Sequence, residues 1–181
     1  MKMKMKMKMK KLSNIAGTTI GLLMVMHSAY AADTVNLNIT GNVVASPCVV
    51  NGGVGNIDVD LGNIQATTLA AAGSSSTEIP FDIKLTACPT GTSSVTATFA
   101  GTSDPVAGVN YYKSTGTAGN VAVALIQASN SSLKGNGSTI TQAVQADRTV
   151  TMSMKAKAYS SAGSATPGTI KSVVTATFTY Q

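Results

Sequence analysis

The stretch at residues 169–180 constrains the fold of this chain more than any other feature of its sequence. Its apolar side chains fall on alternate positions and nearly all the positions between them are polar; the apolar set is Ile170, Val174, Ala176, Phe178 and Tyr180. A period of two residues is typical of a β-strand with one buried face and one solvated face. Only Gln181 follows. No further strand follows to pair with it, so we expect its neighbouring strand to come from another part of the chain or from another molecule.

The preceding part of the chain has the composition of an antiparallel β-protein. Thr, Ser, Val, Ala and Gly dominate, and short alternating runs are separated by Gly, Asn, Ser and Pro turns. This pattern predicts an all-β sandwich. We expect strands at residues 34–50, 56–61, 78–88, 94–100, 120–127, 149–159 and 169–180. The segment 65–72 is expected to form at most one helical turn.

A second clearly alternating stretch lies near the start of the chain. Polar residues separate its members, which are Val35, Leu37, Ile39, Gly41 and Val43. An exposed apolar strand near a free end is an aggregation hazard. The pattern makes sense if this strand enters another molecule, and the alternative is that it pairs within its own chain.

Residues 1–31 are predicted to be a cleaved secretory signal peptide. Six lysines lie in the first eleven residues, an apolar run from Ile20 to Met26 follows, and Ala29-Tyr30-Ala31 supplies a small-residue cleavage site. The run is shorter than the ~20 residues that a membrane anchor needs. The net charge of +6 belongs to this leader, because residues 32–181 hold seven cations and seven acids. We therefore expect no nucleic-acid partner and no direct membrane insertion.

The expected mature chain, residues 32–181, lacks the residues that most enzyme sites need. It has no His and no Trp, so a His-dependent triad or a His-ligated metal site is excluded. Cys48 and Cys88 are its only cysteines, and in a secreted chain they are expected to form a disulfide. We predict a protein that is not an enzyme and has no cofactor, no metal and no catalytic residue.

Several segments of the chain together resemble the pilin subunits of bacterial chaperone–usher fimbriae. The marks are the alternating N-terminal stretch, the Cys48/Cys88 pair, Cys88-Pro89-Thr90-Gly91-Thr92, Val95-Thr96-Ala97-Thr98-Phe99, Gly168 and the penultimate Tyr180. The resemblance is greatest to the minor tip-fibrillum or adaptor subunits of the type 1 family, over residues 41–49, 88–101, 111–113 and 167–181. A major rod-forming subunit is the alternative within the family.

The resemblance implies an incomplete immunoglobulin-like sandwich that lacks its last strand and is completed by a donor strand from a neighbouring subunit. It divides the chain into the signal peptide at 1–31, a donor-strand extension at 32–45 and a pilin domain at 46–181. The expected donor residues are Val35, Leu37, Ile39, Gly41 and Val43, with Gly41 in the narrow pocket. The expected acceptor and chaperone-binding residues are Ile170, Val174, Ala176, Phe178, Tyr180 and Gln181.

The same resemblance names the partners and the location. The partners are neighbouring fimbrial subunits, a periplasmic chaperone and an outer-membrane usher. The subunit is expected on the cell surface in a fimbrium that supports adhesion, after passage through the periplasm. A rival from a different class is a self-complete secreted immunoglobulin-like binding module.

A few polar and aromatic clusters allow other interpretations. Tyr111-Tyr112-Lys113 could form a sugar-binding platform, but we favour partly buried loop aromatics. Asp58 and Asp60, with Asp82, could bind Ca²⁺, but we favour a solvated strand face. Lys155 and Lys157 are expected to lie on a solvated face in the same way.

Overall fold

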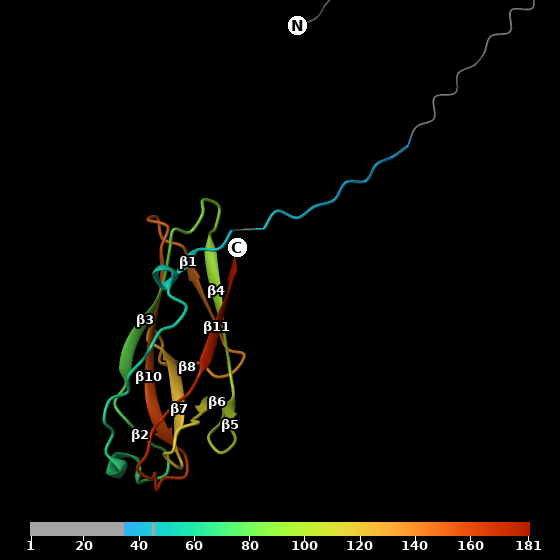
Figure 1. Ribbon diagram of the computed structural model, residues 1–181. Helices are drawn as coiled ribbons and strands as arrows, with labels where there is room; N and C mark the ends of the chain where they lie inside the picture. Colours follow the sequence, from blue (N-terminus) through green and yellow to red (C-terminus); the bar gives the residue numbers. More distant parts are fainter. Residues whose placement is uncertain (1–34, 45) are drawn as a thin grey trace, which may run out of the picture. The chain divides into compact units, whose positions relative to one another are not determined.

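A computed structural model of the chain describes residues 35–44 and 46–181. The predicted signal peptide at 1–31 lies outside the described residues, as do residues 32–34 and 45 of the predicted donor strand. The chain divides into two units, residues 1–40 and 41–181. In the first unit, residues 35–40 form neither helix nor strand, and all described strands belong to the second unit (Figure 1).

The second unit contains a large antiparallel sheet. Its main path runs in the order β1 (Val49–Val50), β3 (Ile79–Thr86), β10 (Val150–Ser160), β7 (Ala122–Gln127), β6 (Gly108–Lys113) and β5 (Ser103–Asp104). Two short strands lie off this path: β2 (Ser74–Ser75) pairs with β10, and β8 (Ser132–Leu133) pairs with β7. All of these pairs are antiparallel.

A second antiparallel sheet has three strands. Its order is β11 (Val174–Tyr180), β4 (Ser94–Gly101) and β9 (Thr139–Ala143). Among the described residues, helical structure is limited to two 3-10 turns, η1 (Asn51–Gly53) and η2 (Ala66–Leu69). Neither turn is long and apolar enough to cross a membrane.

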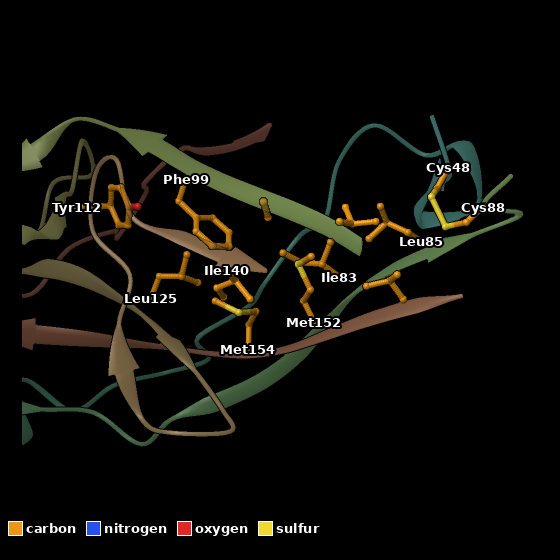
Figure 2. Close-up of a cluster of buried hydrophobic side chains, with 13 residues drawn as sticks. Cys48, Ile83, Leu85, Cys88, Phe99, Tyr112, Leu125, Ile140, Met152 and Met154 are labelled. Atoms are coloured by element: carbon orange, nitrogen blue, oxygen red, sulfur yellow. A yellow bond between two sulfur atoms is a disulfide. The ribbon is translucent and has the colours of Figure 1, made fainter. Parts of the chain in front are cut away.

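The core lies between the inner faces of the two sheets (Figure 2). Strand β10 alternates strictly, and its inner face carries the buried Val150, Met152 and Met154. They form one cluster with buried residues of β4 and β3, which include Phe99 and Leu85. A smaller cluster, built on Leu69, Val121 and Ala158, contains partly buried Ile64 and Ile170. The predicted all-β sandwich is therefore confirmed.

The strand predictions held for four of the longer strands. Strands β3, β4, β7 and β10 lie within one or two residues of the expected bounds. The prediction for 56–61 was wrong: this segment is not a strand, and the Asp60 carboxylate instead accepts a hydrogen bond from the Gly62 N–H at 2.8 Å. This local turn competes with strand pairing. Of the expected strand 34–50, only β1 at Val49–Val50 is formed among the described residues.

Five described strands were not predicted from the sequence: the short β2, β5 and β8, and the longer β6 and β9. Strand β9 buries one residue, Ile140, so its sequence carries hardly any apolar alternation. Strand β6 includes Tyr111 and Tyr112, which were expected in a loop. Tyr112 is fully buried, whereas Tyr111 lies on the other face of the strand.

Candidate subunit-interaction site

The outer edge of β11 has no strand partner among the described residues. Strand β11 ends the three-stranded sheet and pairs with β4 from Val174 opposite Gly101 to Tyr180 opposite Val95. Just beyond this ladder, Gln181 and Ser94 exchange both backbone hydrogen bonds, at 3.0 and 3.1 Å. In an antiparallel ladder such pairs alternate with pairs that make no hydrogen bonds to each other. The backbone groups that face away from β4 therefore belong to Val174, Ala176, Phe178 and Tyr180.

These four residues also form the apolar face of β11, and this face is only partly covered. Each side chain is partly exposed and packs against the main core cluster. In the neighbouring strand β4, the corresponding inner residues Val95, Ala97 and Phe99 are at most 1% exposed. The two strands share one sheet and one core. The apolar face of β11 therefore lacks a cover that β4 has.

The opposite sheet is also open along part of an edge. Strand β1 pairs with only two residues of β3, Leu85 and Thr86. On this side of β3, the segment from Ile79 to Lys84 has no strand partner among the described residues. Phe81 lies in this segment and is another partly buried member of the core cluster.

Tyr180 connects the end of β11 with the beginning of the sandwich. Burial raises the pKa of its phenol above the ordinary value, and a backbone hydrogen bond from Cys48 acts in the opposite direction. Cys48 directly precedes β1, which belongs to the other sheet. The two sheets therefore approach each other at this end.

The disulfide between Cys48 and Cys88 is formed, as predicted, and lies at one end of the buried cluster (Figure 2). Cys48 is 6% exposed and Cys88 is fully buried. The bond joins the residue before β1 to a residue just beyond the end of β3. It closes a loop across a sequence separation of 40 residues, for which the chain-entropy model gives about 4 kcal/mol.

The N-terminal alternating segment has the opposite character to the core strands. Residues 35–44 form no strand, and the side chains of Val35, Leu37, Ile39 and Val43 are exposed, with Ile39 at 91%. A Cβ atom at Gly41 would meet no atom within 4 Å.

One predicted acceptor residue lies apart from the others. Ile170 precedes β11 and packs in the smaller cluster with Leu69 and Val121, not in the main core. The segment around it pairs with residues 114–119: the N–H of Ala118 donates to the Thr169 carbonyl at 3.0 Å, and that of Thr115 donates to the Lys171 carbonyl at 2.7 Å. The expectation of one continuous strand from 169 to 180 was therefore wrong, because the chain changes partners before residue 174.

The two lysines of β10 were predicted to lie on a solvated face. In the structure, both instead pair with a carboxylate. The Nζ atoms of Lys155 and Lys157 lie 2.9 and 3.3 Å from the two carboxylate oxygens of Glu78. The hydrogen bonds from these lysines lower the pKa of Glu78. Asp82 accepts a hydrogen bond from the Ser153 hydroxyl at 2.8 Å.

The fold and the incompletely covered β11 define a class of protein, an antiparallel sandwich domain with an open strand edge. A family model described as fimbrial protein matches residues 37–181, and the chain belongs to this family. It is 40% identical over 172 residues to the S-fimbrial adhesin protein SfaS of Escherichia coli O6:K15:H31 (strain 536 / UPEC), covering 94% of this chain and 99% of the relative. It is 35% identical over 166 residues to the protein FimG of E. coli K12, covering 91% and 96%.

A solved structure shows the same fold. The P pilus rod subunit PapA aligns with a TM-score of 0.63 and 21% identity, over 75% of this chain and all of that structure. The chain is therefore a structural subunit of a cell-surface fimbrium, and its partners include neighbouring fimbrial subunits.

Proposed function

We propose that this chain is a minor subunit near the tip of a fimbrium and that it polymerises by donor-strand exchange. The observation that carries the proposal is the state of β11. Its outer edge has no partner among the described residues and its apolar face is half-covered. This exchange is the known assembly mode of chaperone–usher pilins and is one form of strand addition to a sheet edge.

A donor strand would meet two needs of β11 at once. Its backbone would pair with the outward N–H and C=O groups of Val174, Ala176, Phe178 and Tyr180, which are costly to bury without partners. Its side chains would cover the apolar face that these residues present. The acceptor groove would lie between β11 and the open edge of β3, and Gln181 would extend the chaperone-binding edge.

The segment 32–45 is the proposed donor, and 46–181 is the proposed pilin domain. The apolar residues of the proposed donor segment are exposed and spaced for one face of a strand: Val35, Leu37, Ile39 and Val43. Burying each side chain would contribute roughly 1.5–3 kcal/mol before the cost of ordering the segment. By the resemblance to pilins, Gly41 would occupy the narrow pocket of the groove.

Before assembly, another protein has to protect the open edge. A periplasmic chaperone would lend a strand to β11, and an outer-membrane usher would supply the site of exchange. The proposed signal peptide at 1–31 directs the chain to the periplasm. In this role the subunit is structural and has no enzymatic activity.

The choice of a minor tip subunit over the major rod subunit rests on similarity. The segments 41–49, 88–101, 111–113 and 167–181 resemble minor tip-fibrillum subunits, and a relative at 40% identity is described as a fimbrial adhesin. Immunogold labelling of intact fibres tests this choice. Label at the tips is expected, whereas label along the whole shaft would reassign the chain to the rod.

The sharpest test of donor-strand exchange separates the two roles of one molecule. Ile39→Asp places a charge where the donor strand is buried, without an opposite charge, which costs several kcal/mol. The proposed acceptor groove of the same molecule does not include residue 39. The variant should therefore accept a donor strand normally and fail to donate its own. The measurement is a two-subunit exchange reaction, run in both directions and read as SDS-resistant dimers in unboiled samples.

Asn38→Asp is the matched control, because it adds the same charge to the other face of the strand and should leave both directions intact. Failure of Ile39→Asp in both directions, or in neither, would contradict a one-way donor strand. The rival, a self-complete binding module, predicts that residues 32–181 expressed alone give a monomeric product that folds cooperatively.

A further inference from the structure

A small surface cavity is lined by residues of β5, β6, β7 and β10 and of the loops beside them. In Figure 1, β5 and β6 lie at the end of the domain opposite β1 and the C-terminus. The volume of the cavity is about 170 Å³. This is small beside the roughly 300–1,000 Å³ of pockets for drug-sized ligands. Its lining residues come from three loops and the strand ends beside them, and they include Asp104, Val106, Lys113, Asn120 and Tyr159. The cavity suits a single compact chemical group.

The aromatic wall of the cavity is one ring of a stacked pair of tyrosines. Tyr159 borders the cavity and stacks on Tyr111, with ring centroids 4.2 Å apart and planes 15° from parallel. The two tyrosines lie on β10 and β6, the strands on either side of β7. On β7, Ala122 is the strand partner of Tyr159, and Ala124 lies two residues further along the same face. Both alanines are buried, although this face of β7 points away from the main core. Because β7 carries only methyl groups here, the rings can meet above it.

Polar groups complete the cavity, and their charges balance. Asp104 is anionic and Lys113 is cationic, and both line the cavity. One carboxylate oxygen of Asp104 accepts the N–H groups of Val106 and Ala107, at 2.9 and 2.7 Å, which fixes the β5–β6 turn. The side-chain amide of Asn120 donates to the Ser164 carbonyl at 3.3 Å, which anchors the opposite loop. The side-chain carbonyl of Asn120 has no donor among the described residues and can accept a further hydrogen bond.

From this arrangement we propose that the cavity binds one terminal neutral monosaccharide of a glycan. An aromatic face packs against the C–H face of a pyranose ring, while hydroxyl groups need amide, carboxylate and ammonium partners around them. One anion and one cation do not favour a charged ligand over a neutral one. The volume admits a single sugar and not a chain. This inference does not rest on donor-strand exchange, because no residue of the site lies in β11 or in 35–43.

The test uses intact fimbriae and four neutral probes, the methyl glycosides of mannose, galactose, glucose and N-acetylglucosamine. Binding is measured by saturation-transfer difference NMR, and signal from fimbriae that lack this chain is subtracted. At least one glycoside should give a remaining signal. Tyr159→Ala should weaken its binding about tenfold, and Tyr159→Phe should retain it, because the ring and not its hydroxyl forms the wall.

A blocking variant keeps the test independent of folding defects. Val106 is 71% exposed and borders the cavity, so Val106→Trp should fill the cavity without disturbing the core and should abolish the signal. Val109→Trp is the matched control. Val109 is 69% exposed on the same hairpin and does not line the cavity, so this variant should bind normally.

Three results would overturn the assignment. They are the absence of signal from every neutral glycoside, a signal that Val106→Trp leaves unchanged, and binding of glucuronate that Lys113→Met abolishes while no neutral glycoside binds. Loss of fibre assembly in Val106→Trp, with no glycoside signal in the wild type, would instead make the cavity a subunit contact.

Discussion

The segment 35–43 and strand β11 have nearly the same sequence pattern but different structures. Both alternate apolar and polar residues. Strand β11 bonds to β4 along its whole length, whereas 35–43 forms no strand and exposes its apolar side chains. The difference shows that alternation alone does not make a strand. A strand also needs a partner edge, and β11 obtains one from β4 in its own sandwich.

The comparison also shows what each region lacks. Strand β11 has one bonded edge and an apolar face that is only partly covered. The segment 35–43 has an apolar face and no bonded edge among the described residues. In the proposed fibre, the deficit of one region is met by the other region of a neighbouring subunit.

Removing the end of β11 is the change with the largest expected effect. Deleting residues 178–181 should abolish the stable chaperone complex and lead to degradation. The deletion removes Phe178 and Tyr180 from the core cluster and also removes the bonds between Gln181 and residues 93–94. The measurement is co-purification with the chaperone. Thr179→Ala changes only the polar face and should co-purify normally; normal recovery of the truncated chain would disprove the role of this edge.

The second prediction concerns the disulfide at the boundary between the two regions. Cys48 lies five residues after Val43, and its disulfide fixes where the sandwich begins. Cys48→Ser should lower the periplasmic yield sharply, because loss of a native disulfide from a small secreted domain typically costs about 2–5 kcal/mol. Yield and thermal unfolding are the measurements. The double variant with Cys88→Ser should behave alike, and unchanged stability in either would show that the disulfide is not structural.

The sequence predicted those parts of the fold that are set by strong local patterns. Strand β10 was predicted because the apolar residues on its buried face, among them Met152 and Met154, occupy every second position. Strand β9 was not predicted, because β4 supplies its partner edge and its own residues bury only Ile140. The change of partner between Ile170 and Val174 was also missed, although Ser172 and Val173 interrupt the alternation at that point. The two stacked tyrosines lie on strands far apart in sequence, and no local pattern reports such a contact.

The smallest expected effect concerns the core beneath the start of β11. Tyr112 is fully buried, and its hydroxyl has no hydrogen-bond partner among the described residues. Gly101, which is opposite Val174, makes room for its ring: a Cβ there would lie 2.8 Å from a ring carbon of Tyr112. Burial raises the pKa of Tyr112 to about 12. The titration of this phenol therefore reports how well the core is closed near β11.

Because this pKa is higher in the folded chain, the neutral phenol stabilises the fold below pH 10, and that contribution is lost as the pH rises from 10 to about 12. The loss should approach roughly 2–3 kcal/mol. Tyr112→Phe should remove it and should be at least as stable as the wild type at neutral pH, since the unpaired hydroxyl is gone. Denaturant unfolding of both chains at pH 8 and pH 11.5 measures the difference, and parallel losses would mean that Tyr112 is hydrated. A donor strand that covers β11 should make the phenol harder to ionise still, so the same titration in the exchanged dimer distinguishes the open edge from the closed one.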